Sequence, residues 1–169
     1  MERSSQSKWE GKVSSKSTEA TADQIWSLYK DFFNLHKYFP KLASCYGIHG
    51  SNGEPGCIRY CDSFSISLSS DDVGLNERPI SWAKERLIAV DDVERTLSYE
   101  IIESNIGFNS YVATVKIVQG DEVGCVIEFL FTVDPVEGCE FEDLVNMYKL
   151  ALQSIIQKME ESIAITKNF

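Results

Sequence analysis

The sequence is short of positive charge and has no long hydrophobic run. It carries 16 Lys and Arg residues against 26 Asp and Glu, a formal net charge of -10, which repels a phosphate backbone. We therefore expect no nucleic-acid partner. No apolar stretch approaches the roughly 20 residues of a membrane-spanning helix, so we expect no membrane insertion. The start, MERSSQSKWEGK, lacks the apolar core of a secretory signal, and we expect a cytoplasmic protein.

Ligands with the spacing of a metal site are also missing. A zinc site needs clustered ligands at turn or helix spacing, whereas no CxxC pair occurs and neither histidine lies near a cysteine pair. We therefore expect reduced thiols, no metal and no other cofactor. The residues concerned are Cys45, Cys57, Cys61, Cys125, Cys139, His36 and His49.

What the chain does contain is the composition of one folded domain. Of its 169 residues, 43% are hydrophobic and 11% aromatic, which is enough for one sizeable core. We expect a single domain over residues 1–169, with flexible ends at about 1–7 and 166–169.

The hydrophobic pattern predicts an α+β fold. One or two short helices are indicated between the capping residues Thr18 and Thr21 and the stop at Pro40. One long amphipathic helix begins at Phe141, where apolar residues recur at three and four. Alternation between turn signals predicts seven strands, at Lys8–Ser17, Ala43–His49, Cys57–Ile66, Ile80–Val90, Thr96–Glu103, Tyr111–Val118 and Cys125–Val133.

Such an order of elements favours a curved antiparallel sheet wrapped on the long C-terminal helix. Strands this close in sequence pair as antiparallel neighbours, because parallel neighbours need long crossovers. Wrapping the sheet on the helix buries the apolar face of both elements. A sheet too curved to close on the helix leaves a central cavity.

One carboxylate is predicted to face this interior. In SWAKERLIAV, Glu85 is in phase with Leu87 and Ala89, and alternate strand residues share a face. A carboxylate on an apolar face needs a partner or has a raised pKa, because burying an uncompensated charge is costly.

Two further polar residues are predicted to share that interior. The alternation places Arg59 in phase with its neighbouring cysteines and Tyr111 in phase with Val115. Glu85 could then act as general acid or base, with Arg59 holding an anionic oxygen and Tyr111 positioning it. A purely structural Arg–Glu pair is the alternative, and phase alone does not decide between them.

Apolar side chains on the last strand and on the helix are candidate ligand contacts. An aromatic stripe on a strand can line a pocket, but it can equally be core, and helix positions have the same ambiguity. These candidates are Ile127, Phe129, Phe131, Ala151 and Ile155.

Several longer stretches carry a family resemblance over nearly the whole chain. They are KWEGKV, DFFNLHKYFPKLASC, GCIRY, WAKERLIAVD, YVATVKIV and IIQKMEE. With them the chain resembles the START-like, birch-pollen-allergen (polyketide cyclase-like) superfamily, and within it the plant lachrymatory factor synthases. The resemblance implies a helix-grip fold with a central cavity.

The resemblance to the synthases also implies a chemistry and a site. Synthases of this kind rearrange a short unsaturated sulfenic acid to a thial S-oxide without a cofactor, and their pocket arginine and glutamate fall on Arg59 and Glu85. Two pocket aromatics fall on Tyr111 and Tyr99. Where the synthases have a tryptophan on the final helix this chain has Ala151, which implies a larger or differently shaped cavity, and a larger cavity suggests a larger ligand.

Two other departures concern the cavity mouth and a second group of relatives. The segment over residues 61–81 is longer than the corresponding segment of the synthases, and Ser81 stands where the synthases have an aromatic residue. The plant abscisic acid receptors share Glu85 and Tyr111, but their ligand-binding lysine falls on Ala43, their latch on SNIGFNS, and only a trace of their gate remains in VGLNERP.

The sequence thus predicts a protein that binds a small hydrophobic or amphipathic metabolite with a polar head. Whether it also isomerises that ligand or only carries it stays open, a receptor role is less supported, and no protein partner is specified.

Overall fold

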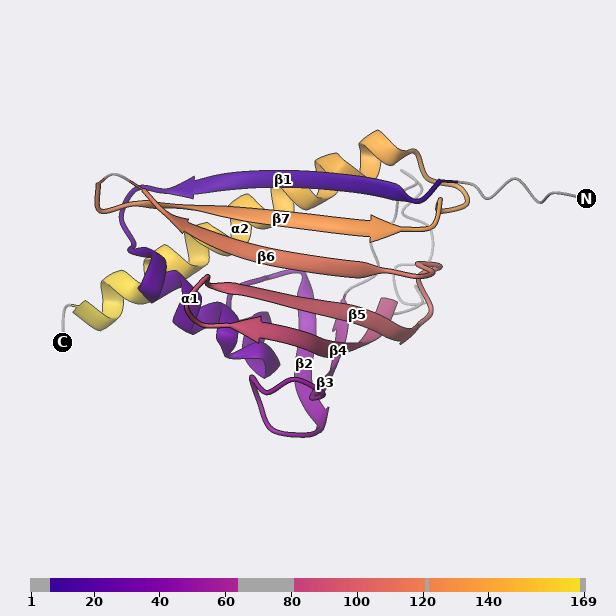
Figure 1. Cartoon of the computed structure of the whole chain (residues 1–169), viewed down its shortest axis with the longest axis horizontal. Coiled ribbons are helices and arrows are strands. Elements are labelled where there is room, and N and C mark those ends of the chain that lie inside the picture. The colour runs from indigo at the N-terminus through magenta and orange to yellow at the C-terminus, as the bar shows by residue number, and fades with distance from the viewer. Residues whose placement is uncertain (1–6, 64–80, 121, 168–169) are drawn as a thin grey trace, which may run out of the picture.

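The chain forms one antiparallel sheet that curves around a long helix (Figure 1). The computed structural model describes residues 7–63, 81–120 and 122–167. The elements in these residues are β1 Trp9–Ser17, α1 Ala22–Lys30, the 3-10 helix η1 Phe32–Lys37, β2 Leu42–His49, β3 Ile58–Ser63, β4 Ser81–Asp91, β5 Thr96–Ser104, β6 Val112–Gln119, β7 Cys125–Val133 and α2 Phe141–Lys167. The predicted α+β helix-grip fold is confirmed.

The seven described strands lie in the order β1-β7-β6-β5-β4-β3-β2, and every neighbouring pair is antiparallel. Helix α2 packs beside β1 and runs along one face of the sheet, whereas η1 packs on β2 at the other end (Figure 1). The two ends of the sheet are therefore covered by different helices.

The first helix begins where a capping box satisfies its free amides. Thr21 accepts a hydrogen bond from the Gln24 amide at 3.1 Å, and the Gln24 side chain accepts one from the Thr21 amide at 2.9 Å. Such reciprocal caps satisfy two donors that a helix start leaves unpaired. Ile25 and Trp26 are buried beneath it, and the chain then turns into η1, whose first residue, Phe32, points inward.

Strand alternation is regular in β3 but breaks in β4. Arg59 is buried together with the cysteines on either side of it, as the phase predicts. In β4, Leu87 is buried, but Ala89 is exposed and Val90 packs on the core instead. The prediction for Ala89 is wrong because the β4–β5 register shifts between Leu87 and Ala89, and such a shift moves later side chains to the other face.

Part of the predicted cavity mouth lies outside the described residues. The last three residues of the predicted strand Cys57–Ile66 belong to this stretch, as do the gate trace VGLNERP and most of the insert between Cys61 and Ser81.

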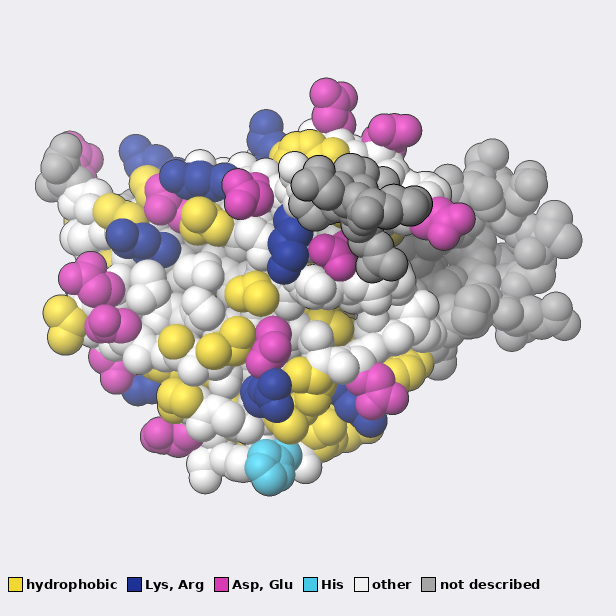
Figure 2. Space-filling model, turned by 45° about the vertical axis from the view of Figure 1, so that its right-hand side comes forward, with side chains coloured by type: hydrophobic (Ala, Val, Ile, Leu, Met, Phe, Trp, Pro, Cys, Tyr) yellow, Lys and Arg dark blue, Asp and Glu magenta, His cyan; other side chains and the backbone are white. Residues whose placement is uncertain are grey.

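The surface carries charges of both signs. On the face shown in Figure 2, lysine and arginine side chains are scattered among acidic ones and form no continuous basic tract. None of the helices in the described residues is long and apolar enough to cross a membrane.

Candidate functional site

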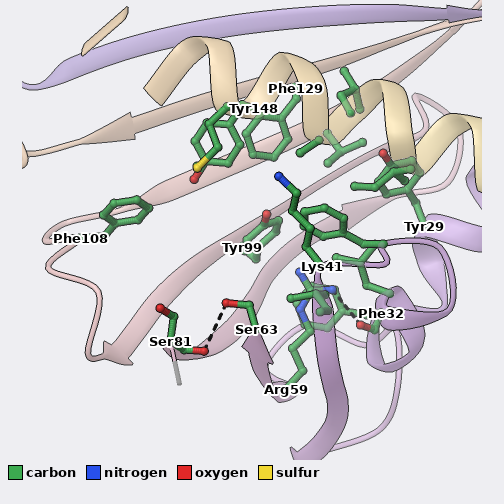
Figure 3. Close-up of a pocket in the computed structure, with 18 of the residues that line it drawn as sticks. Tyr29, Phe32, Lys41, Arg59, Ser63, Ser81, Tyr99, Phe108, Phe129 and Tyr148 are labelled. Atoms are coloured by element: carbon green, nitrogen blue, oxygen red, sulfur yellow. Dashed lines mark hydrogen bonds between the residues drawn. The ribbon is translucent and has the colours of Figure 1, made fainter. Parts of the chain in front are cut away.

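Two adjoining cavities lie between the sheet, η1 and α2. The main cavity has a volume of about 280 Å³, and the side cavity about 170 Å³. Both are far larger than the roughly 10–15 Å³ that one water needs. Arg59, Tyr99 and Tyr148 line both of them, so the two spaces meet at these side chains (Figure 3).

An ion pair fixes the wall between the cavities. Arg59 and Glu85 lie directly opposite each other on β3 and β4, and Arg59 Nε donates to Glu85 Oε1 at 2.8 Å. Arg59 Nη1 also donates to the carbonyl of Phe32 at 2.8 Å, and its guanidinium lies 3.7 Å from the centre of the Phe32 ring. Three separate contacts thus hold the arginine in one position.

The pair is enclosed unevenly. The Arg59 side chain is 4% exposed and that of Glu85 is 14% exposed. Burial alone would lower the pKa of Arg59, but the Glu85 carboxylate, together with the nearby Cys61, Tyr99 and Cys45 side chains, offsets this and holds the pKa above its usual range. Arg59 and Glu85 both line the side cavity, and the less enclosed Glu85 carboxylate is the member of the pair that a small molecule reaches more readily from there.

Tyrosines form the opposite wall. The hydroxyl groups of Tyr111 and Tyr148 are hydrogen-bonded at 2.7 Å, and this bond connects the residue just before β6 to α2. Burial raises the pKa of both phenols, so they stay protonated at neutral pH. Tyr111 lines the side cavity together with Arg59 and Glu85, but its hydroxyl group is hydrogen-bonded to that of Tyr148.

Because these phenols are buried, we expect the protein to lose stability in alkaline solution. Burial raises the pKa of Tyr29, Tyr99, Tyr111 and Tyr148 above that of the unfolded chain. Above about pH 10 the unfolded chain therefore binds fewer protons than the folded one, and the free energy of unfolding falls by up to about 1.4 kcal/mol per pH unit for each group.

The Tyr29→Phe variant tests this directly. In denaturant unfolding between about pH 9 and 12, the free energy of unfolding of the variant is expected to fall less steeply with pH than that of wild type. The difference is the contribution of the one phenol that the variant lacks. Tyr46→Phe, at a side chain 51% exposed on the outer face, is the control and is expected to keep the wild-type slope. Equal slopes for Tyr29→Phe and wild type would contradict the account.

A second cation reaches the main cavity. Lys41 lies between η1 and β2 and lines this cavity, and Figure 3 shows its side chain extending toward the side where Phe129 and Tyr148 lie. Among the described residues it has no ion-pair partner within 4.0 Å. Ala43, on which the receptor lysine falls, is exposed. The cavity therefore has a lysine, two residues before the expected position.

The structure distributes the predicted site residues unequally. Arg59 lines both cavities, while Glu85 and Tyr111 line the side cavity. The remaining predicted contacts on the main cavity are Tyr99, Phe129, Ala151 and Ile155.

Two predicted contacts lie in the core and line neither cavity. Ile127 is fully buried. Phe131 is covered by α2, because its ring centre lies 4.8 Å from that of Tyr148 and 6.4 Å from that of Phe141. The stripe on β7 is therefore cavity wall at Phe129 and core at the other two positions.

Several lining residues had no clear signal in the sequence. Tyr148 belongs to the apolar stripe of α2, which does not distinguish a cavity contact from core. Phe32 and Lys41 lie in short, aperiodic segments around η1, and Phe108 lies in the loop SNIGFNS that replaces the receptor latch. In the described residues no group of three or more His, Cys, Asp or Glu side chains could hold a metal ion.

Comparisons with known proteins agree with this architecture. The chain is 27% identical over 145 residues to the abscisic acid receptor PYL2 of Arabidopsis thaliana, covering 83% of this chain and 70% of the receptor. Its fold matches ginseng major latex-like protein 151 from Panax ginseng with a TM-score of 0.68 at 16% identity, covering 90% of this chain and 97% of that one.

A bacterial structure shares the same fold. The protein XoxI from Bacillus cereus matches with a TM-score of 0.66 at 19% identity, covering 90% of this chain and 94% of that one. The sequence profile of the family described as polyketide cyclase/dehydrase and lipid transport matches residues 11–163. The chain therefore belongs to the polyketide cyclase/dehydrase and lipid transport family.

Proposed function

We propose that this protein binds a small, mostly apolar molecule with an anionic head in its main cavity. The observation that carries the proposal is a largely apolar cavity lined by one exposed lysine, Lys41, that has no ion-pair partner among the described residues. Pockets of this kind, apolar with a few polar groups that fix orientation, are typical of small-molecule sites. A family that includes lipid transport is consistent with such a ligand.

Charge decides which end of the ligand lies where. Arg59 is already neutralised by Glu85 at 2.8 Å, and that carboxylate repels a second anion. Lys41 has no such partner in the described chain, so the anionic head belongs beside its amine. The apolar part then packs on Phe129 and Ile155, which line the same space.

The Lys41→Gln variant tests this orientation. Displacement of a fluorescent apolar probe by decanoate and by decanol compares two ligands that differ in the head group. Lys41→Gln is expected to weaken decanoate binding about tenfold, near the 1.4 kcal/mol of one charge-assisted hydrogen bond, and to leave decanol unchanged.

A neighbouring lysine supplies the control. Lys37 is exposed at the end of η1 and does not line either cavity, so Lys37→Gln is expected to bind both ligands as wild type does. Equal loss of decanoate and decanol binding in Lys41→Gln would contradict the proposed head-group contact.

A second candidate function is cofactor-free isomerisation at the side cavity. It is favoured by one observation, the reach of the Glu85 carboxylate into that space beside Arg59. There Glu85 could accept the hydroxyl proton of a sulfenic acid and return a proton to carbon, while Arg59 stabilises the oxygen anion that forms. The reaction would yield a thial S-oxide.

Glu85→Gln separates this candidate from simple binding. With a sulfenic acid generated in the assay, the variant is expected to lose at least about 100-fold in rate, which is the usual contribution of a general acid or base. Glu103→Gln, on the exposed side of β5 where it pairs with Lys84, is expected to keep the rate. Undiminished product formation by Glu85→Gln would exclude isomerisation by this residue.

A further inference from the structure

Two cysteines lie opposite each other on the neighbouring strands β2 and β3. Cys45 on β2 and Cys61 on β3 are directly paired in the antiparallel register, and their sulfur atoms lie 2.7 Å apart. Directly opposed residues of antiparallel strands have Cα atoms about 4.5–5.5 Å apart, within the roughly 4.4–6.8 Å that disulfides span. The spacing of this register therefore allows a bond between them.

We propose that Cys45 and Cys61 are a redox-active dithiol that closes into a cross-strand disulfide in the wall of the side cavity. Both are buried, with 5% and 7% of their surface exposed, so bulk solvent has little access to them. Cys61 nevertheless lines the side cavity. A small oxidant such as hydrogen peroxide can therefore reach the pair through that space.

The chemistry balances with peroxide as the oxidant. The first sulfur attacks one peroxide oxygen, the O–O bond breaks, and a sulfenic acid and one water form. The second sulfur then attacks the sulfenic sulfur and releases the hydroxyl as a second water. Two thiols lose two electrons and two protons in total, and peroxide is reduced to two waters. A dithiol reductant reverses the change by thiol–disulfide exchange.

The surroundings activate one thiol of the pair. The hydrogen bond shared with Cys61 lowers the pKa of the Cys45 thiol by more than burial raises it, with the Arg59 cation lowering it and the Glu85 carboxylate raising it. The same hydrogen bond, together with burial, raises the pKa of the Cys61 thiol. Thiolates, not thiols, are the reactive form. Cys139, in contrast, is the least buried cysteine but has no opposed sulfur, and burial together with Asp143 raises its pKa.

Peptide mapping of the full chain tests the proposal. The protein is treated with a small excess of hydrogen peroxide, denatured in N-ethylmaleimide and cut with trypsin and chymotrypsin. Cleavage after Tyr46 and Arg59 separates Cys45, Cys57 and Cys61 into different peptides. The linked Cys45–Cys61 peptide is expected to exceed any other linked pair at least tenfold and to disappear after dithiothreitol, while Cys139 is recovered alkylated.

Two variants and two outcomes complete the test. Cys57→Ser, at a buried cysteine two positions from Arg59, is expected to keep the link, and Cys61→Ser to abolish it. Recovery of Cys45 and Cys61 as alkylated thiols after peroxide, or oxidation of Cys139 before them, overturns the proposal. The measurement needs no cavity ligand, so its result is independent of the proposed function.

Discussion

Replacing Ala151 by tryptophan is expected to abolish ligand binding without unfolding the protein. Ala151 is half-buried on the face of α2 that lines the main cavity, and an indole at this position projects into the space that the ligand needs. We expect the affinity for an apolar probe to fall at least about 100-fold, or about 2.8 kcal/mol. Because the indole fills an existing hollow, the unfolding midpoint is expected to stay at or above that of wild type.

The adjacent residue provides a matched control for this result. Leu150 is 63% exposed on the other side of the same helix turn, so Leu150→Trp adds the same group outside the cavity. Probe binding to this variant is expected to equal that of wild type. Full probe affinity in Ala151→Trp, measured by fluorescence titration, would place the binding site elsewhere.

Removing the Arg59 side chain is expected to destabilise the fold by about 3–5 kcal/mol, the range for breaking a buried ion pair from one side. Arg59→Met leaves the Glu85 carboxylate without its cation and the Phe32 carbonyl without its donor. Denaturant unfolding measures the loss. The double variant Arg59→Met/Glu85→Leu is expected to recover most of it, because an apolar pair has no uncompensated charge.

A second arginine on the neighbouring strand serves as the control. Arg86 pairs with Glu100 at 2.8 Å on the exposed side of the sheet, where ion pairs contribute about 0–1 kcal/mol. Arg86→Met is therefore expected to change the free energy of unfolding by no more than that. If Arg59→Met lowered the free energy of unfolding by no more than Arg86→Met does, the Arg59–Glu85 pair would not be what holds the cavity wall.

The fold could be predicted from the sequence because its strands alternate and its turns are marked. The phase of Arg59 and Glu85 follows from local alternation, and their pairing adds only the β3–β4 register. Ala89 marks the limit of this reasoning. The register shift after Leu87 depends on how β4 pairs with β5, which periodicity within one strand does not contain.

The lining of the cavity was harder to predict because it depends on the distance between elements. Phe129 lines the main cavity, whereas Phe131, two residues further along the same face, is covered by α2. Lys41 lies outside any periodic element, so neither alternation nor the receptor position at Ala43 indicated it. These differences arise from where the helices stop covering the sheet, which is a property of the packed chain.

The most direct measurement of the central claim is the location of a bound anionic ligand by methyl NMR. Ile155 lines the main cavity, whereas Ile48 and Ile88 are exposed by 45% and 43% on the outer side of the sheet. With isoleucine methyl groups labelled in the full chain, saturating decanoate is expected to shift the Ile155 signal and to give contacts between this methyl group and the acyl chain. Shifts confined to Ile48 and Ile88, with the Ile155 signal unchanged at saturation, would contradict binding in the cavity.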